Sequence, residues 1–290
     1  MCRGSSRQTE LVNPVAKALW YIESHFAQEV TLDDVASVSA VSRYYMSRAF
    51  ATLVGVSMQS YLRGRRLSEA AKQLADGADD ILSVALAYGY GSHEAFTRAF
   101  RDQFGVTPES VRANGHVRNL ALVQPIRLEQ AMTTQLSPPR FEDHGPMLVV
   151  GLTGRYTQAT SAGIPAQWQR FTPHLGHVPS QANGDAYGVC YNTDDEANMD
   201  YLCGVEVRNF ANVPPELARL RIPPQHYAVF EHRGHISSIN ETFKSIFGEW
   251  LPSSGYEMAD APLFERYPSS FDGRTGAGGL EVWVPVEKKS

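Results

Sequence analysis

The chain has 290 residues, of which 43% are hydrophobic and 20% are charged, so it exceeds the usual size of one hydrophobic core and predicts two domains of an ordinary soluble protein. No apolar run approaches the ~20 residues that cross a bilayer, and the start lacks the apolar core of a signal peptide, so we expect a cytoplasmic protein with no membrane partner. The net charge of -5 excludes a protein that coats nucleic acid through bulk positive charge.

A repeat at an offset of about 50 residues is the strongest signal in the first part of the chain. Arg48-Ala49-Phe50 recurs as Arg98-Ala99-Phe100, and Gly55-Val56-Ser57 recurs as Gly105-Val106-Thr107. Residues 1–115 carry about twelve Lys and Arg against about twelve Asp and Glu. Any affinity of this part for DNA must therefore come from arginines placed on one face.

In the first copy, Leu32 to Val38 predicts a short helix, with Thr31 and Asp34 as a capping-box variant. Ser39-Ala40-Val41 predicts a tight turn, and Ser42 is a plausible N-cap of the next helix. This order is typical of a helix-turn-helix unit.

Tyr61 to Ala75 has apolar residues on one face and predicts a long linker helix. The second copy then follows, with acidic Asp79-Asp80 before a helix from Ile81 to Ala87, and Ser92 as the N-cap of its second helix. Thr107-Pro108 predicts the start of a closing helix. The first part of the chain is thus predicted to be all-α, with two tandem helix-turn-helix units joined by a linker helix.

These residues resemble the DNA-binding half of the AraC/XylS family of transcription regulators, from about Pro14 to Asn114. The residues that carry the likeness are Gly89-Tyr90-Gly91-Ser92-His93-Glu94-Ala95-Phe96-Thr97-Arg98-Ala99-Phe100 and Phe104-Gly105-Val106-Thr107-Pro108. The resemblance implies sequence-specific binding to double-stranded promoter DNA, with RNA polymerase as a further partner.

A helix in the major groove offers its first two turns to base edges, and arginine makes bidentate contacts with guanine. The candidate DNA contacts are Arg43, Tyr44, Ser47 and Arg48 in the first copy and Ser92, His93, Glu94, Thr97 and Arg98 in the second. A rigid linker helix can hold two such helices about one DNA turn, ~34 Å, apart. The alternative is that these residues form only the solvated face of amphipathic helices.

Arg63, Arg65 and Arg66 lie close together on the predicted linker helix, and Arg101 and Arg112 flank the second copy. We expect them to contact phosphates. The alternative is surface pairing with Glu69, Asp102 and Glu109.

From about Gly115 to Pro139 the chain has no clear periodicity and reads as a connection between domains. A second, weaker repeat follows, in which a strand ending in glycine leads into an amphipathic helix. The strands are Leu148 to Gly154 and Tyr227 to Gly234, the helices carry Ile164, Trp168 and Phe171 or Ile239 to Trp250, and further strands are Tyr187 to Asn192, Tyr201 to Val207 and Gly279 to Pro285. This order predicts an α+β domain with a pseudo-duplicated strand-helix-strand unit.

This half resembles the GyrI-like small-molecule-binding domain. The residues that carry the likeness are Asp200 to Val207, Trp250-Leu251-Pro252, Gly255-Tyr256-Glu257, Phe264-Glu265-Arg266-Tyr267 and Leu280 to Pro285. The two resemblances divide the chain into a DNA-binding domain at 10–115, a linker at 116–139 and a small-molecule-binding domain at 140–290. The DNA-binding half comes first, the reverse of the more common order in the family.

Carboxylates among aromatic residues are the notable feature of the second half. The candidate ligand contacts are Trp168, Tyr201, Glu206, Trp250, Glu265 and Tyr267. Aromatic faces and a carboxylate in an apolar pocket attract a lipophilic cationic or amphipathic molecule, and the resemblance implies that Glu265 lies at the pocket floor. The alternatives are a glutamate satisfied by Arg266 or backbone donors, and ordinary core tryptophans.

Cys190 and Cys203 fall on the two arms of a predicted hairpin centred near Glu196. A thiol switch or soft-metal site needs further ligands, so buried strand residues are the preferred interpretation. No metal or other cofactor and no catalytic set is predicted.

The sequence therefore predicts a transcription regulator controlled by a small molecule, and not an enzyme. The alternatives are a DNA-tethered hydrolase with Glu206 or Glu265 as general base, and a second domain that binds a protein partner.

Overall fold

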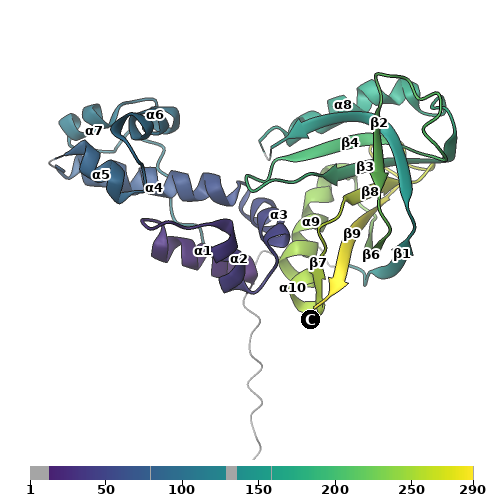
Figure 1. Cartoon of the computed structure of the whole chain (residues 1–290), viewed down its shortest axis with the longest axis horizontal. Helices are drawn as coiled ribbons and strands as arrows, with labels where there is room; N and C mark the ends of the chain where they lie inside the picture. The colour runs from purple at the N-terminus through teal and green to yellow at the C-terminus, as the bar shows by residue number, and fades with distance from the viewer. Residues whose placement is uncertain (1–12, 79, 129–135, 158, 290) are drawn as a thin grey trace, which may run out of the picture.

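The computed structural model describes residues 13–78, 80–128, 136–157 and 159–289. A helical half and a half built around a curved sheet lie side by side (Figure 1). The helix α3, from the helical half, lies between them. Within the described residues, no helix is both long and apolar enough to cross a membrane.

The helical half contains two helix-turn-helix units joined by one long helix, as predicted. Its helices are α1 (Pro14–His25), α2 (Leu32–Ser39), α3 (Arg43–Val54), α4 (Met58–Ala75), α5 (Ile81–Ala87), α6 (His93–Phe104) and α7 (Pro108–Asn114). The linker helix α4 begins three residues earlier than predicted because Ser57 caps it by accepting a hydrogen bond from the N–H of Ser60.

The predicted helix caps are confirmed. Thr31 and Asp34 form a reciprocal capping box at α2. Ser42 accepts from the N–H of Tyr45 at α3, and Ser92 accepts from the N–H of Ala95 at α6. Asp80 caps α5, while Asp79 lies outside the described residues. These local hydrogen bonds fix where each helix begins and so which residues stand in its first two turns.

The two ends of α4 belong to different hydrophobic cores. Its first turns pack with α1, α2 and α3 in a cluster that continues into the sheet half. Its later turns pack with α5, α6 and α7 in a separate cluster around Phe96 and Phe100. The two units therefore have separate cores at opposite ends of one helix, as Figure 1 shows.

The described part of the predicted linker runs along α4. The Ser68 hydroxyl accepts from the N–H of Val123 at 2.8 Å, and the Tyr61 hydroxyl accepts from the N–H of Ile126 at 3.0 Å. Gly64 leaves room for this approach, since a Cβ there would lie 2.7 Å from Cγ2 of Val123. The connection is thus fastened to the helical half before it reaches the sheet.

In the residues that the structure describes, the sheet half contains nine strands and several short helices. The strands are β1 (Arg140–His144), β2 (Met147–Tyr156), β3 (Gln181–Tyr191), β4 (Met199–Val207), β5 (Ala218–Ile222), β6 (Gln225–His232), β7 (Tyr256–Met258), β8 (Leu263–Tyr267) and β9 (Leu280–Lys288), and the helical segments are η1 (Ser161–Gly163), α8 (Ile164–Phe171), η2 (Thr172–His174), η3 (Ile236–Ser238), α9 (Ile239–Ser245), η4 (Ile246–Trp250) and α10 (Leu251–Ser253). The strand order is β1-β6-β9-β8-β3-β4-β2-β5, and β7 pairs with β9 outside this path.

The short link between β1 and β2 forces this sheet to curl. Only Gly145 and Pro146 join β1 to β2, so the two strand ends lie at most about 11 Å apart. A flat sheet would separate the same two strands by about 29 Å, since six steps divide them in the strand order. The curled inner face encloses a second core that contains Tyr187, Tyr227, Phe264 and Trp283.

The predicted strands and helices of the sheet half are present, but the structure contains four further strands that the sequence analysis did not predict. β1, β5, β7 and β8 were not predicted, and β3 begins at Gln181 instead of Tyr187. These strands are short, except for β3, whose first residues are mostly polar or glycine and pair with β4 only at Gln181, before an irregularity that ends at Ala186.

The curl predicts a strong requirement for glycine at position 204. Gly151 and Gly204 are paired on β2 and β4, and a Cβ on Gly204 would lie 2.4 Å from the carbonyl oxygen of Val150. Because backbone cannot move aside as a flexible side chain can, we expect Gly204→Ala to lower the free energy of unfolding by about 1–3 kcal/mol. Urea denaturation measures this, with Gly145→Ala, which meets no atom within 4 Å, as control. Equal stabilities of the two variants would contradict the argument.

Candidate functional site

The second helix-turn-helix unit presents its candidate DNA contacts to solvent. Glu94 and Arg98 are exposed on α6, and the ring of His93 lies 3.0 Å from Oε1 of Glu109. Hydrogen bonds from its own N–H and from the Ser92 hydroxyl lower the pKa of Glu94, so it is an ionised acceptor at neutral pH. The Thr97 hydroxyl differs, because its oxygen is buried with no hydrogen-bond partner among the described residues.

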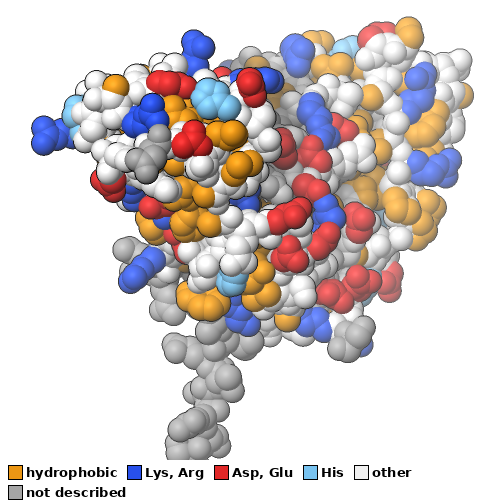
Figure 2. Space-filling view, turned by 60° about the vertical axis from the view of Figure 1, so that its left-hand side comes forward, with side chains coloured by type: hydrophobic (Ala, Val, Ile, Leu, Met, Phe, Trp, Pro, Cys, Tyr) orange, Lys and Arg blue, Asp and Glu red, His pale blue; other side chains and the backbone are white. Residues whose placement is uncertain are grey.

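The surface around these residues is mixed in charge. In Figure 2, Lys and Arg side chains are scattered among acidic side chains over the face that is shown. This agrees with the net charge of -5. DNA affinity must then depend on a few arginines placed by the fold and not on a broad basic surface.

The first unit presents the equivalent face to the sheet half instead of to solvent. The Ser47 hydroxyl donates to the carbonyl oxygen of Asp194 at 3.0 Å, and Nη2 of Arg48 donates to the Thr193 hydroxyl at 2.7 Å. Only 5% of Ser47 and 8% of Arg48 is exposed. Their proposed contact with DNA therefore requires the two halves to separate at this point.

The other two candidates on α3 also contact the sheet half. The Tyr44 hydroxyl donates to the carbonyl oxygen of Ala261 at 3.0 Å. Arg43 pairs through Nε and Nη2 with both carboxylate oxygens of Asp195, and through Nη1 with Asp33. All four predicted contacts of the first copy thus have protein partners in this structure.

The three arginines of α4 are not equivalent, which corrects the expectation that they form one phosphate clamp. Arg65 is 3% exposed and donates to both oxygens of Glu23, to Glu69 and to the carbonyl of Val123. Arg66 donates to the carbonyl oxygens of Phe26 and Gln28. Their donors hold the fold together, and only Arg63 of the three has an exposed side chain.

A carboxylate surrounded by aromatic side chains lies on the outer face of the sheet. Oε2 of Glu265 accepts from the hydroxyl of Tyr267 at 2.7 Å and from that of Tyr201 at 3.0 Å. Trp168 donates from Nε1 to the Tyr201 hydroxyl at 3.0 Å, and its ring meets that of Tyr267 edge-on at 5.1 Å. We call these four residues the Glu265 cluster.

Burial dominates the electrostatics of this cluster. Glu265 is 8% exposed, and burial raises its pKa although the two tyrosine hydroxyls lower it. Burial beside the carboxylate also raises the pKa of Tyr201 and Tyr267 well above the usual range, so both hydroxyls keep their protons and can donate. Burial therefore works against ionisation of Glu265, and a cation beside the carboxylate would favour the ionised form.

Gly188 is a site residue that the sequence analysis missed. Tyr201 on β4 and Glu265 on β8 belong to strands on either side of β3, and they meet above Gly188. A Cβ there would lie 2.1 Å from the Tyr201 hydroxyl oxygen and 2.7 Å from Oε2 of Glu265. A glycine inside an otherwise strand-like run, Tyr187 to Asn192, was the signal that could have identified it.

Two predicted ligand residues lie elsewhere. Glu206 accepts from the Asn183 amide at 2.7 Å and shares the inner face with Tyr187, whereas Tyr201 packs in the outer-face core. Trp250 packs against Phe230 and Tyr256. Glu206 and Tyr201, both predicted as ligand contacts, do not share one site, because residues separated by an odd number of positions on one strand point to opposite faces.

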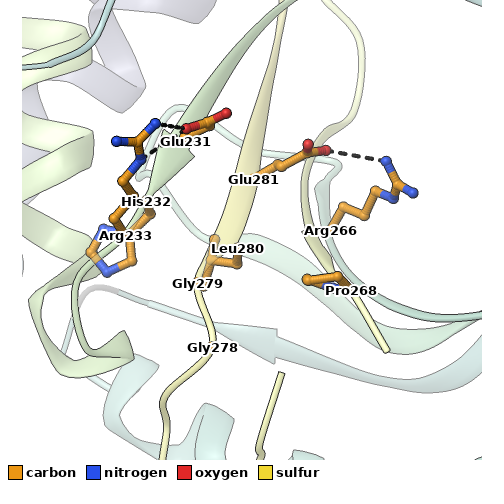
Figure 3. A pocket seen from close by; sticks show the side chains of 9 residues that line it. All are labelled: Glu231, His232, Arg233, Arg266, Pro268, Gly278, Gly279, Leu280 and Glu281. Carbon is orange, nitrogen blue, oxygen red and sulfur yellow. Dashed lines mark hydrogen bonds and ion pairs between the residues drawn. The ribbon is translucent and has the colours of Figure 1, made fainter. Parts of the chain in front are cut away.

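Neither of two open cavities in the described part of the sheet half is lined by the Glu265 cluster. One of about 250 Å³ is lined by Glu142, His144, Asn183, Tyr187, Glu206, Phe264, Arg266 and Trp283. The other, of about 290 Å³, lies at the ends of β6, β8 and β9, and in it Glu231 pairs with Arg233 and Glu281 with Arg266 (Figure 3). In the Glu265 cluster, Tyr201 is 2% exposed and Glu265 and Tyr267 are each 8% exposed, so a ligand there must move the partly exposed Trp168.

Cys190 and Cys203 are buried free thiols on neighbouring strands. They are not directly opposite, because Cys190 pairs with Tyr201 and Cys203 pairs with Gly188. Burial raises the pKa of Cys190 to about 12, so this thiol is protonated at neutral pH. The described residues contain no group of three or more His, Cys, Asp or Glu placed to hold a metal ion.

Comparison with known proteins identifies both halves. Residues 137–287 match the GyrI-like small molecule binding domain, and residues 35–114 match a helix-turn-helix domain. The chain is 27% identical over 283 residues to the transcriptional regulator Rob of Salmonella typhimurium, covering 93% of this chain and 96% of Rob. It is 26% identical over 295 residues to the right origin-binding protein of Escherichia coli K12, with the same coverage.

The similarity to solved structures is weaker. SAV2435 bound to tetraphenylphosphonium is 19% identical with a TM-score of 0.45, and it covers 52% of this chain and 94% of its own. The family matches place the protein: the chain belongs to the AraC-type helix-turn-helix transcription regulators that carry a GyrI-like small-molecule-binding domain.

The different environments of Arg63 and Arg65 predict opposite effects of substitution. Arg65→Ala leaves Glu23 without its main partner, so we expect a loss of roughly 2–3 kcal/mol in unfolding free energy and no change in the salt dependence of DNA binding. Arg63→Ala should leave stability unchanged and lower the slope of log K against log salt by about 0.9. Thermal denaturation and fluorescence anisotropy at several salt concentrations measure the two effects. A lower slope of log K against log salt for a stably folded Arg65→Ala variant would show that Arg65 contacts a phosphate.

Proposed function

We propose that this regulator binds a lipophilic cation at the Glu265 cluster and that the bound ligand alters promoter recognition by α3 and α6. The observation that carries the ligand class is Glu265 itself: a buried carboxylate whose partners are neutral hydroxyls. Tyr201 and Tyr267 supply hydrogen bonds at 3.0 and 2.7 Å but no positive charge. A cation that reaches this carboxylate would supply the positive charge that its two tyrosine partners lack.

The aromatic side chains of the cluster suit the apolar part of such a ligand. Trp168 is partly exposed on α8 and covers Tyr267, so its displacement would open two aromatic surfaces next to one carboxylate. Rings can attract a cation through their faces, and the effect is larger where water is excluded. A large aromatic cation therefore fits better than a small hydrated one.

The helical half supports reading of DNA at two places by a single chain. The helix α4 has 18 residues and is about 27 Å long, and each of its ends anchors a unit with a recognition helix. This length is compatible with two contacts about one DNA turn, ~34 Å, apart. Because a regulator bound at a promoter lies beside the transcription machinery, RNA polymerase is its proposed further partner.

Binding is favoured over hydrolysis at the same cluster. Oε2 of Glu265 already accepts hydrogen bonds from two tyrosine hydroxyls, and the side chain is 8% exposed. A general base needs a water or substrate proton within hydrogen-bond reach. The closed environment of Glu265 therefore supports a role in recognition.

DNA reading by α6 can be tested at Arg98. We expect Arg98→Ala to weaken binding to a duplex selected from a random pool by about 1–3 kcal/mol and to relax the preference at one base pair, because an exposed arginine in the first turns can contact guanine. Arg101 is an exposed neighbour one turn later on the helix, and Arg101→Ala is the matched control: as a candidate phosphate contact it should weaken selected and random DNA equally and leave the base preference unchanged. Equal weakening on selected and random DNA would make Arg98 a phosphate contact instead.

Ligand charge can be tested with tetraphenylphosphonium and the neutral triphenylphosphine oxide. Glu265→Gln keeps the size of the side chain, so we expect at least a tenfold loss for the cation, about 1.4 kcal/mol, and little change for the neutral compound. Isothermal titration calorimetry of the full chain measures both affinities. Equal loss for the two compounds would mean that Glu265 supports the fold rather than recognising charge.

The pH dependence gives a second readout of the same test. Burial raises the pKa of Glu265, so the carboxylate gains a proton at a higher pH than an ordinary glutamate. Affinity for the cation should be constant well above this pKa and should fall as the pH is lowered through it. In Glu265→Gln the affinity should not vary with pH in this range, because the amide does not titrate there.

A further inference from the structure

The recognition helix of the first unit is docked on the sheet half through the residues that DNA would contact. Met46, Ala49 and Phe50 of α3 face the core of their own unit. Tyr44, Ser47 and Arg48, which stand in the first two turns, contact the sheet half. These turns are the part of a helix-turn-helix unit that enters the major groove.

The tip of the β3–β4 hairpin supplies most of the acceptors for this contact. The Asp195 carboxylate accepts a hydrogen bond from Arg43, and the carbonyl oxygen of Asp194 accepts one from the Ser47 hydroxyl. The Thr193 hydroxyl accepts one from Arg48. Two guanidinium groups and a hydroxyl are also the donors with which proteins bind phosphates and base edges. The hairpin thus offers α3 oxygen acceptors and negative charge in place of those of DNA.

The hairpin tip is held in its conformation by contacts within the sheet half that do not involve α3. The carboxylate of Asp194 accepts from the N–H groups of Glu196 and Asn198 and from the Asn198 amide, and Arg155 pairs with Asp194 and Asp200. Arg155 therefore engages the neighbouring acids, while Asp195 at the tip pairs with Arg43. A preformed acceptor surface of this kind loses little entropy when it receives α3.

Docking and groove binding use the same atoms. The Arg48 side chain is 8% exposed and is held between the Thr193 hydroxyl and the Tyr44 ring, whose centroid lies 4.9 Å from its guanidinium carbon. One nitrogen, Nε, is buried with no partner among the described residues. In the docked position the guanidinium group of Arg48 therefore makes fewer hydrogen bonds than it has donors for. A DNA duplex cannot reach this group unless α3 separates from the hairpin.

We propose that the β3–β4 hairpin is an intramolecular competitor of DNA: it occupies α3, so that the docked chain reads DNA through α6 alone. This inference rests on the proposed function, because it takes α3 to be a DNA-reading helix. The apparent affinity for a site that needs both helices is then reduced by the fraction of molecules in which α3 is docked.

The α3-binding surface also borders the Glu265 cluster. Arg48 lies 3.5 Å from the carbonyl oxygen of Cys190, and Cys190 pairs across the sheet with Tyr201, a hydrogen-bond donor to Glu265. A cation bound at Glu265 would place a second positive charge near Arg48 in a region of low dielectric constant. The expected sign of regulation is therefore release of α3 by the bound cation.

The experiment compares hairpin and control variants of the full chain on two selected duplexes. One duplex contains only the site read by α6, and the other contains both sites. Asp195→Asn weakens docking without substituting any of the candidate DNA contacts, so we expect about two- to fivefold tighter binding to the two-site duplex and unchanged binding to the single site. Asp143→Asn removes the same charge from a side chain that is 91% exposed in the same half, and should change neither affinity.

Hydrogen exchange of the hairpin reads the docked state directly. Two-site DNA, and separately saturating tetraphenylphosphonium, should increase exchange at residues 192–198 in the wild type, and the cation should have no such effect in Glu265→Gln. Footprinting of both sites while the hairpin stays protected would overturn the inference and leave the proposed function intact. Absence of selective DNA binding in every variant, wild type included, would overturn both.

Discussion

The packing of α3 against two different partners is the interaction on which the arrangement of this molecule depends. One side of α3 completes the core of its own helix-turn-helix unit, and the other meets α9, η4, β7 and the tip of the β3–β4 hairpin, so a single hydrophobic cluster extends through both halves. The Tyr45 hydroxyl reinforces this junction by donating to the carbonyl of Phe247 at 2.7 Å. The second unit lies beyond α4 with a core of its own, and it remains open to solvent.

The curl of the sheet decides which side chains can act together. The inner face is filled with Tyr187, Tyr227, Phe264 and Trp283, so a buried ligand site has to form on the outer face or at the rim. On the outer face, Gly188 allows side chains from β4 and β8 to meet across β3. The Glu265 cluster therefore depends on a missing side chain as much as on those that are present.

Local sequence signals were sufficient for the helical half. Thr31, Ser42 and Ser92 cap the helices that follow them, as predicted, because a cap depends on hydrogen bonds within a few residues. Arg65 could not be assigned in this way, since its partner Glu23 comes from α1, 42 positions earlier. Its burial is a consequence of tertiary packing, which the charge pattern of α4 alone does not contain.

The ligand-binding half was predictable in parts. The alternation of side chains along a strand already places Glu265 and Tyr267 on one face, and applied to β4 it would have separated Glu206 from Tyr201. The meeting of Tyr201 with Glu265 could not be predicted, because it requires β4, β3 and β8 to be neighbours in the sheet. The docking of α3 was even less predictable from the sequence, since no local pattern distinguishes a helix face that contacts DNA from one that contacts protein.

The duplicated units are therefore subject to unequal constraints. A substitution at Ser47 or Arg48 changes the fit of α3 to the hairpin at the same time as it changes the surface offered to a groove. A substitution at Arg98 on α6 has no such second consequence, because that side chain is exposed. If both helices read DNA as proposed, new promoter preferences arise by single changes in the second unit, whereas in the first they require matching changes on the hairpin more than 140 positions away.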